Sequence, residues 1–202
     1  MPNYFTIAMA EMKRGSGNFK VICYGIKEKC ILSVQMKHQD IISNNEVMWD
    51  LFALTEAELS ETNREYLELR QKGNLKKYYS KDDAKSFFNN QCIDAAYFYN
   101  SDKTYAVIAP SSVAIKPPEV DDDGIKHRVD FKCNNFSRSS VLNKDYRMLN
   151  YWASLDKEQY KEKANYWQSY LKKPDTTVYL VLYNHVFRSG NNRKWIAGFH
   201  CL

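Results

Sequence analysis

Two stretches at opposite ends of this chain follow the same pattern, and both predict a β-hairpin. Each consists of two apolar, aromatic runs joined by a Ser-Gly-Asn turn with Lys or Arg on either side. The first extends over residues 4–25 and the second over residues 179–199. Gly and Asn tolerate the positive φ angles that tight hairpin turns require, so both turns have a physical basis. Any fold of this chain must accommodate an antiparallel hairpin near each end.

The segments between the hairpins alternate between helical and strand patterns. A third apolar run at residues 30–35 extends the first hairpin into a three-strand meander. Capping pairs and apolar residues at three- and four-residue steps predict helices, whereas short runs rich in β-branched residues predict a middle group of strands. The expected helices cover residues 55–73, 80–99, 142–152 and 154–171, and the expected strands cover 104–108, 113–116 and 125–133.

This order lacks a repeated strand–helix–strand alternation, which would indicate a parallel sheet. The sequence therefore predicts an α+β fold. We expect an antiparallel sheet built from the N-terminal three-strand meander, the middle strand group and the C-terminal hairpin, with about four helices packed on it. A length of 202 residues fits a single domain over residues 1–202. The Pro- and Asp-rich segment 110–124 is the one place where a seam between two lobes could lie.

Composition indicates a cytoplasmic protein that does not enter a membrane. No early segment has the pattern of a signal peptide, and no apolar run approaches the length of a membrane helix. Five scattered cysteines without an export signal indicate reduced thiols. A net charge of +5 with a pI near 8.8 is only mildly basic, so charge alone does not indicate a nucleic-acid partner.

The basic hairpin tips are the first candidate site. Lys and Arg at the end of a rigid two-strand arm can neutralise phosphates or meet an acidic protein surface, and glycines let the backbone approach closely. The simpler interpretation is that charged tips are solvated and prevent sheet ends from associating. The candidate residues are Lys13, Arg14 and Lys20 at the first tip, and Arg188, Arg193 and Lys194 at the second.

A second candidate is an Asp-x-Lys step in the expected strand 125–133. Period-two alternation places Asp130 and Lys132 on one face, and this arrangement is similar to that of metal-dependent nucleases of the restriction-enzyme type. There, the carboxylate would hold Mg²⁺ and the Lys would stabilise developing phosphate charge, with Asp121 or Glu119 as a further acid. A half-buried strand with outward polar residues explains the same pattern without any chemistry.

Other enzymatic and metal signatures are weak. Cys92 and His185 could form a thiol–imidazole pair, but Cys92 falls within a helical apolar stripe. No Cys pair has zinc-binding spacing, and the common nucleotide-binding, hydrolase and zincin motifs are missing. We therefore expect no metal and no small-molecule cofactor, with Mg²⁺ required only in the nuclease alternative.

These observations favour a non-catalytic binding protein, such as an inhibitor, an immunity factor or an accessory factor. Its partner would be an acidic protein surface or a nucleic acid, recognised by the basic hairpin tips. Abundant Tyr and Trp are compatible with either partner, because exposed aromatic rings serve both protein interfaces and base stacking. The alternative is a Mg²⁺-dependent nuclease acting on DNA or RNA through Asp130 and Lys132.

Overall fold

A computed structural model gives the fold, and it describes residues 1–11, 16–63, 66–71, 73–187 and 189–202. The chain forms two compact units, Met1–Ala84 and Lys85–Leu202. Strands predominate, and the overall class is the α+β class that the sequence predicts. Each unit contains its own large sheet, so the single sheet that we expected is wrong, and the two end hairpins belong to different sheets.

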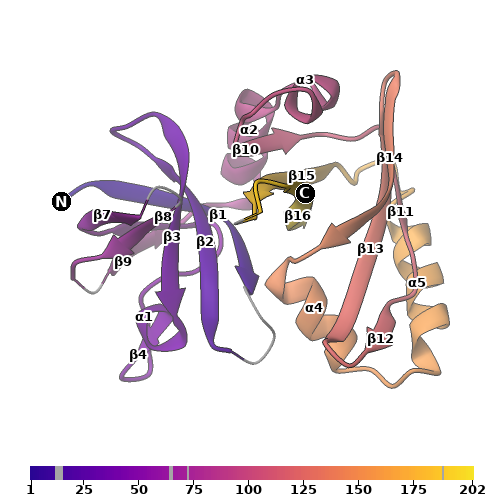
Figure 1. Ribbon diagram of the computed structural model, residues 1–202, viewed down its shortest axis with the longest axis horizontal. Helices are drawn as coiled ribbons and strands as arrows, with labels where there is room; N and C mark the ends of the chain where they lie inside the picture. Colours follow the sequence, from indigo (N-terminus) through magenta and orange to yellow (C-terminus); the bar gives the residue numbers. More distant parts are fainter. Residues whose placement is uncertain (12–15, 64–65, 72, 188) are drawn as a thin grey trace. The chain divides into compact units, whose positions relative to one another are not determined.

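The first unit is a seven-stranded sheet in the order β7-β8-β3-β2-β1-β6-β9 (Figure 1). Its predicted meander is confirmed as β1, β2 and β3, which pair antiparallel, while β3 and β8 run parallel. The elements are β1 (Asn3–Glu11), β2 (Asn18–Gly25), β3 (Cys30–Lys37), α1 (His38–Ile41), β4 (Ile42–Ser43), β5 (Glu46–Val47), β6 (Ala53–Glu56), β7 (Leu59–Asn63), β8 (Tyr66–Leu69) and β9 (Asn74–Tyr78).

The helix expected over residues 55–73 is wrong, because the described residues of this segment form the end of β6 together with β7 and β8. Ala53 and Thr55 are both fully buried at period two, which is the pattern of a strand. The Thr55 hydroxyl donates to the Met48 carbonyl at 3.3 Å instead of capping a helix. Gly73 does not end a helix either: a Cβ there would collide with the Trp49 indole. Pairing of β6 with β1 and β9 outweighs the local helical propensity.

The second unit contains a sheet in the order β10-β15-β16-β14-β13-β11, with β12 paired to β13 (Figure 1). The expected middle strands and C-terminal hairpin are confirmed, although β14 and β16 pair parallel. The elements are α2 (Lys81–Gln91), which begins in the first unit, α3 (Ala95–Tyr99), β10 (Tyr105–Ile108), β11 (Ser112–Ile115), β12 (Glu119–Asp121), β13 (Gly124–Cys133), β14 (Phe136–Asn143), α4 (Tyr146–Ala153), α5 (Gln159–Tyr170), β15 (Val178–Val186) and β16 (Asn192–Cys201).

Helices α3, α4 and α5 contribute side chains to the core on one face of this sheet, including Phe98, Trp152 and Tyr160. Helix α5 also protects the sheet edge, since the Gln168 amide bonds the Ile115 N–H and the Val113 carbonyl of β11 at 3.0 and 2.9 Å. Residues 110–124 lie within this unit and form β11, β12 and the turn to β13. The expectation of one domain over residues 1–202 stays a prediction.

The helix expected over residues 80–99 is divided into α2 and α3. With the short α1, which the sequence analysis did not predict, the described residues form five helices rather than about four. The division occurs where Cys92 bridges to Val107 of β10. Asp94 then starts α3 by accepting a hydrogen bond from the Tyr97 N–H at 2.8 Å. None of the helices in the described ranges is long and apolar enough to cross a membrane.

Candidate polyanion-binding surface

The six basic residues predicted at the hairpin tips have different environments. Lys13, Arg14 and Arg188 lie outside the described residues. Lys20 is only 2 % exposed on β2, which is buried on both faces along most of its length, so it does not lie on an exposed tip. Arg193 is exposed and Lys194 is half-buried, both at the start of β16. That the two tips share one surface stays a prediction, since they belong to different units.

The C-terminal hairpin closes as the turn residues predict. The Phe187 N–H donates to the Asn191 carbonyl at 2.7 Å, and the Gly190 N–H donates to the Phe187 carbonyl at 2.9 Å. Gly190 has a φ of +81°, a left-handed conformation that glycine adopts without strain. The resulting register pairs His185 with Arg193, so these two side chains share one face of the hairpin.

Lys194 points to the opposite face of the hairpin, toward α3. Its ammonium donates to the carbonyls of Tyr99 and Ser101 at 2.8 and 3.2 Å. It also lies over the Phe98 and Tyr99 rings, 5.2 and 5.5 Å from their centroids. Burial lowers the pKa of Lys194, while Asp102 raises it and Arg138 lowers it further. Lys194 and Arg138 therefore lie close enough to repel one another.

Arg138 is an exposed residue of this surface that the sequence analysis missed. Its guanidinium lies over the rings of Tyr99 and Phe136, 4.7 and 4.4 Å from their centroids. These two cation–π contacts hold the guanidinium beside the rings, and one of its N–H groups donates to the Ser137 carbonyl at 3.1 Å. The only sequence signal was the Phe136–Ser137–Arg138 alternation, which places the ring and the cation on one strand face.

Two further cations flank Arg138 and Lys194. Lys132 is exposed on β13 and is adjacent to Phe131, the cross-strand partner of Arg138. Lys103 lies two residues after Ser101, whose carbonyl accepts a hydrogen bond from Lys194. The Lys103 ammonium lies 5.8 Å from the Tyr97 ring centroid. Two exposed acids, Asp94 and Asp102, belong to the same end of the unit. We call this part of the second unit the basic end, and its cations are Lys103, Lys132, Arg138, Arg193 and Lys194. Arg138 and Lys194 share the Tyr99 ring, whereas Lys132 lies on the outer face of β13 and Arg193 lies on the hairpin face opposite to Lys194.

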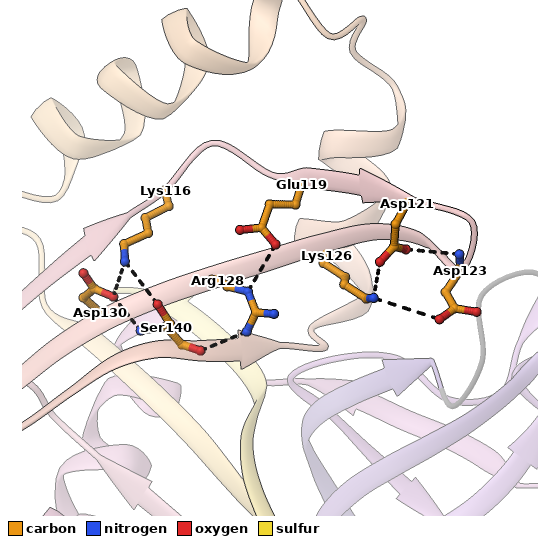
Figure 2. Close-up of polar contacts among 8 residues, drawn as sticks. All are labelled: Lys116, Glu119, Asp121, Asp123, Lys126, Arg128, Asp130 and Ser140. Carbon is orange, nitrogen blue, oxygen red and sulfur yellow. Dashed lines mark hydrogen bonds and ion pairs between the residues drawn. The ribbon is translucent and has the colours of Figure 1, made fainter.

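Three cations on β13 or next to it pair with carboxylates (Figure 2). Lys116 pairs with Asp130 at 3.1 Å, Lys126 pairs with Asp121, and Arg128 pairs with Glu119 at 3.5 Å. These three ion pairs form a ladder across β11, β12 and β13. In contrast, no ion pair to a carboxylate is found for Lys132, Arg138 or Arg193 within the described part of the chain.

The structure does not bring the alternative nuclease residues together. Asp130 and Lys132 share the outer face of β13, as expected, with Val129 and Phe131 buried on the other face. Asp121, however, pairs with Gly124, which lies about 20 Å from Asp130 along the strand. The Asp130 carboxylate instead binds Lys116 and accepts the Ser140 N–H at 2.7 Å (Figure 2). Among the described residues, no group of three or more His, Cys, Asp or Glu side chains could hold a metal ion.

The thiol candidate lacks an activated nucleophile. Burial raises the pKa of Cys92 to about 11, and the nearby Cys133 thiol contributes in the same direction. The thiol is therefore protonated at neutral pH, whereas a catalytic cysteine needs its pKa lowered.

Comparisons with known proteins identify no family for this chain. It matches no protein-family model and no curated protein. Among solved structures, it is similar to the crystal structure of the Ifi202 HINa domain in complex with 20bp dsDNA, at 10% sequence identity and a TM-score of 0.38. The similarity covers 100% of this chain and 95% of that chain. A likeness this low carries no argument about partner or mechanism.

Proposed function

We propose that the protein is a non-catalytic binding protein that engages nucleic acid through the basic end of its second unit. One observation carries the proposal: Lys116, Lys126 and Arg128 pair with carboxylates, whereas Lys132, Arg138 and Arg193 have no such pair among the described residues. Cations that no carboxylate neutralises attract a polyanion, and binding then releases the condensed counterions of that polyanion.

The geometry of the basic end supports phosphate contacts in particular. Arg138 presents a planar guanidinium that two rings hold in place, and this group can bind a phosphate through two N–H groups. Arg193 lies beside the hairpin turn, where Ser189 and Gly190 have small side chains or none, so a phosphate can approach closely. An acidic protein surface could also meet these cations, because a guanidinium binds carboxylates as well as phosphates, and the binding test distinguishes the two partners.

Binding of labelled DNA and RNA, measured by fluorescence anisotropy across a salt series, tests this proposal. Affinity should fall steeply between about 50 and 200 mM salt. Arg138→Gln with Arg193→Gln should weaken binding about 10- to 100-fold and reduce the slope of log affinity against log salt by about 2.

Arg128→Gln is the matched control, because it removes one arginine charge from a neighbouring strand position that Glu119 already neutralises. Its affinity and salt slope should stay close to those of the original protein. The proposal is wrong if neither nucleic acid binds at low salt, or if Arg128→Gln weakens binding as much as the loss of Arg138 and Arg193. Binding to an acidic protein without binding to nucleic acid would likewise contradict it.

A further inference from the structure

One face of the C-terminal hairpin carries a run of aromatic rings that ends at the exposed turn. The His185 ring stacks on the Trp195 indole, with centroids 4.9 Å apart and planes at 13°. Phe187 then meets the edge of His185, with centroids 4.6 Å apart and planes at 83°. Exposure rises along this run, from 3 % at Tyr183 to 41 % at Phe187. The rings behind Phe187 therefore hold it in place while one of its sides faces solvent.

Arg193 lies on the same face as this run. It is the cross-strand partner of His185, and Phe187 is two residues further along the chain. A ring on which a base can stack and a cation that can bind the backbone are the two features that single-strand binding sites combine. The hairpin thus presents on one face an exposed ring, Phe187, and a cation, Arg193, that has no ion pair among the described residues.

We propose that the basic end binds single-stranded nucleic acid, with an unpaired base stacked on Phe187 and the adjacent phosphate held by Arg193. This inference rests on the proposed nucleic-acid-binding function and names its substrate class. In a duplex the base faces are already stacked on one another, so they cannot stack on an exposed protein ring. An unpaired base has a free face that can stack on the ring. Tyr97, 55 % exposed with Lys103 over its ring, supplies a second ring and cation pair at the same end.

The test compares a labelled single strand of about 16 nucleotides, as DNA and as RNA, with the duplex of the same sequence. The single strand should bind at least about tenfold more tightly than the duplex, and Phe187→Ala should weaken single-strand binding about tenfold. Phe187→Leu keeps an apolar side chain without a ring, and it should weaken single-strand binding nearly as much as Phe187→Ala. The RNA and DNA arms show whether the sugar contributes to recognition.

Val186→Ala is the matched control, since Val186 is 48 % exposed on the opposite face of the same hairpin. It should leave single-strand binding unchanged. Equal affinity for duplex and single strand, with no effect of either Phe187 variant, would overturn this inference while leaving the proposed function intact. Failure of every nucleic acid to bind would overturn both. Circular dichroism of each variant confirms that a lost affinity does not arise from lost folding.

Discussion

Asp145→Ala is expected to lower the free energy of unfolding by about 4 kcal/mol, because it removes a buried acceptor that joins α4 to β16. The Asp145 side chain is only 2 % exposed. Its carboxylate accepts the Met148 N–H at 3.0 Å, which caps α4, and the Phe199 N–H of β16 at 2.9 Å. Arg147 lies 3.7 Å from the same carboxylate. Alanine would leave both N–H groups buried without an acceptor.

Asp94→Ala provides a matched control for this prediction. Asp94 is also an aspartate that caps a helix, accepting the Tyr97 N–H of α3 at 2.8 Å, but it is exposed. Water can replace its carboxylate, so its loss should cost only about 1 kcal/mol. Urea-induced unfolding of the two variants measures the difference. Equal effects of the two substitutions would mean that the connection between α4 and β16 does not depend on the buried carboxylate.

The second large effect concerns acid stability, which is expected to fall by about 1.4 kcal/mol per pH unit below pH 6.5 because of His127. Burial lowers the pKa of His127 from 6.5 to about 3. Between these values the unfolded chain binds a proton that the folded protein excludes, so stability decreases as the pH falls. The loss should reach about 2 kcal/mol at pH 5 and about 4 kcal/mol at pH 3.

The hydrogen bonds around His127 explain why the proton is excluded. Asn143 accepts the Asp145 N–H through Oδ1 at 3.0 Å, so its Nδ2 is the atom that faces His127 Nδ1 at 3.1 Å. Because an amide NH₂ only donates, Nδ1 must be the unprotonated nitrogen. A second proton would place two donors against each other inside a core that also contains Trp152, 5.3 Å from the imidazole between ring centroids.

Unfolding curves of the original protein and His127→Gln across pH 3 to 7 isolate this contribution. The glutamine variant should lose less stability on acidification. The difference in the free energy of unfolding between the two proteins should therefore narrow as the pH falls. Burial raises the pKa of Asp145, so protonation of Asp145 increases the stability of the folded protein as the pH falls, opposite to His127. This effect is the same in both proteins and cancels when their free energies of unfolding are subtracted. A constant difference between the original protein and His127→Gln would contradict the prediction.

Local patterns were sufficient where the chain forms its own partners. Both end hairpins, β3 and the existence of α4 and α5 agree with the sequence analysis, because turn glycines and periodic apolar residues act over a few neighbouring positions. The helix expected from residue 142 begins only at Tyr146, because residues 142–143 end β14, a strand that the sequence analysis did not predict. The Asn143–Asp145 network was missed, since its members join β13, β14, α4 and β16. Nothing in the sequence near Asp145 indicates that its carboxylate accepts a hydrogen bond from the Phe199 N–H.

In the candidate site too, residues in local motifs were predicted from the sequence, whereas residues whose role depends on distant segments were not. The sequence identified Arg193 and Lys194 from turn chemistry, but it also selected Lys20, which is buried on β2, a central strand of the first sheet. Arg138 was missed because its importance comes from Tyr99, a residue of α3 that is far away in the sequence. Pairing choices between distant strands, which depend on loop closure and shared burial, are not encoded in any single window.

The sequence by itself determined the hairpin turns, the amphipathic helices after residue 140 and the cationic character of the C-terminal turn, since each depends on interactions among nearby residues. Only the tertiary structure decided that the strands separate into two sheets and that residues 55–63 become strands. It also decided which cations are neutralised and which stay unpaired among the described residues. The physical reason is that ion pairing and burial depend on which distant segments become neighbours, and long-range strand pairing alone fixes that.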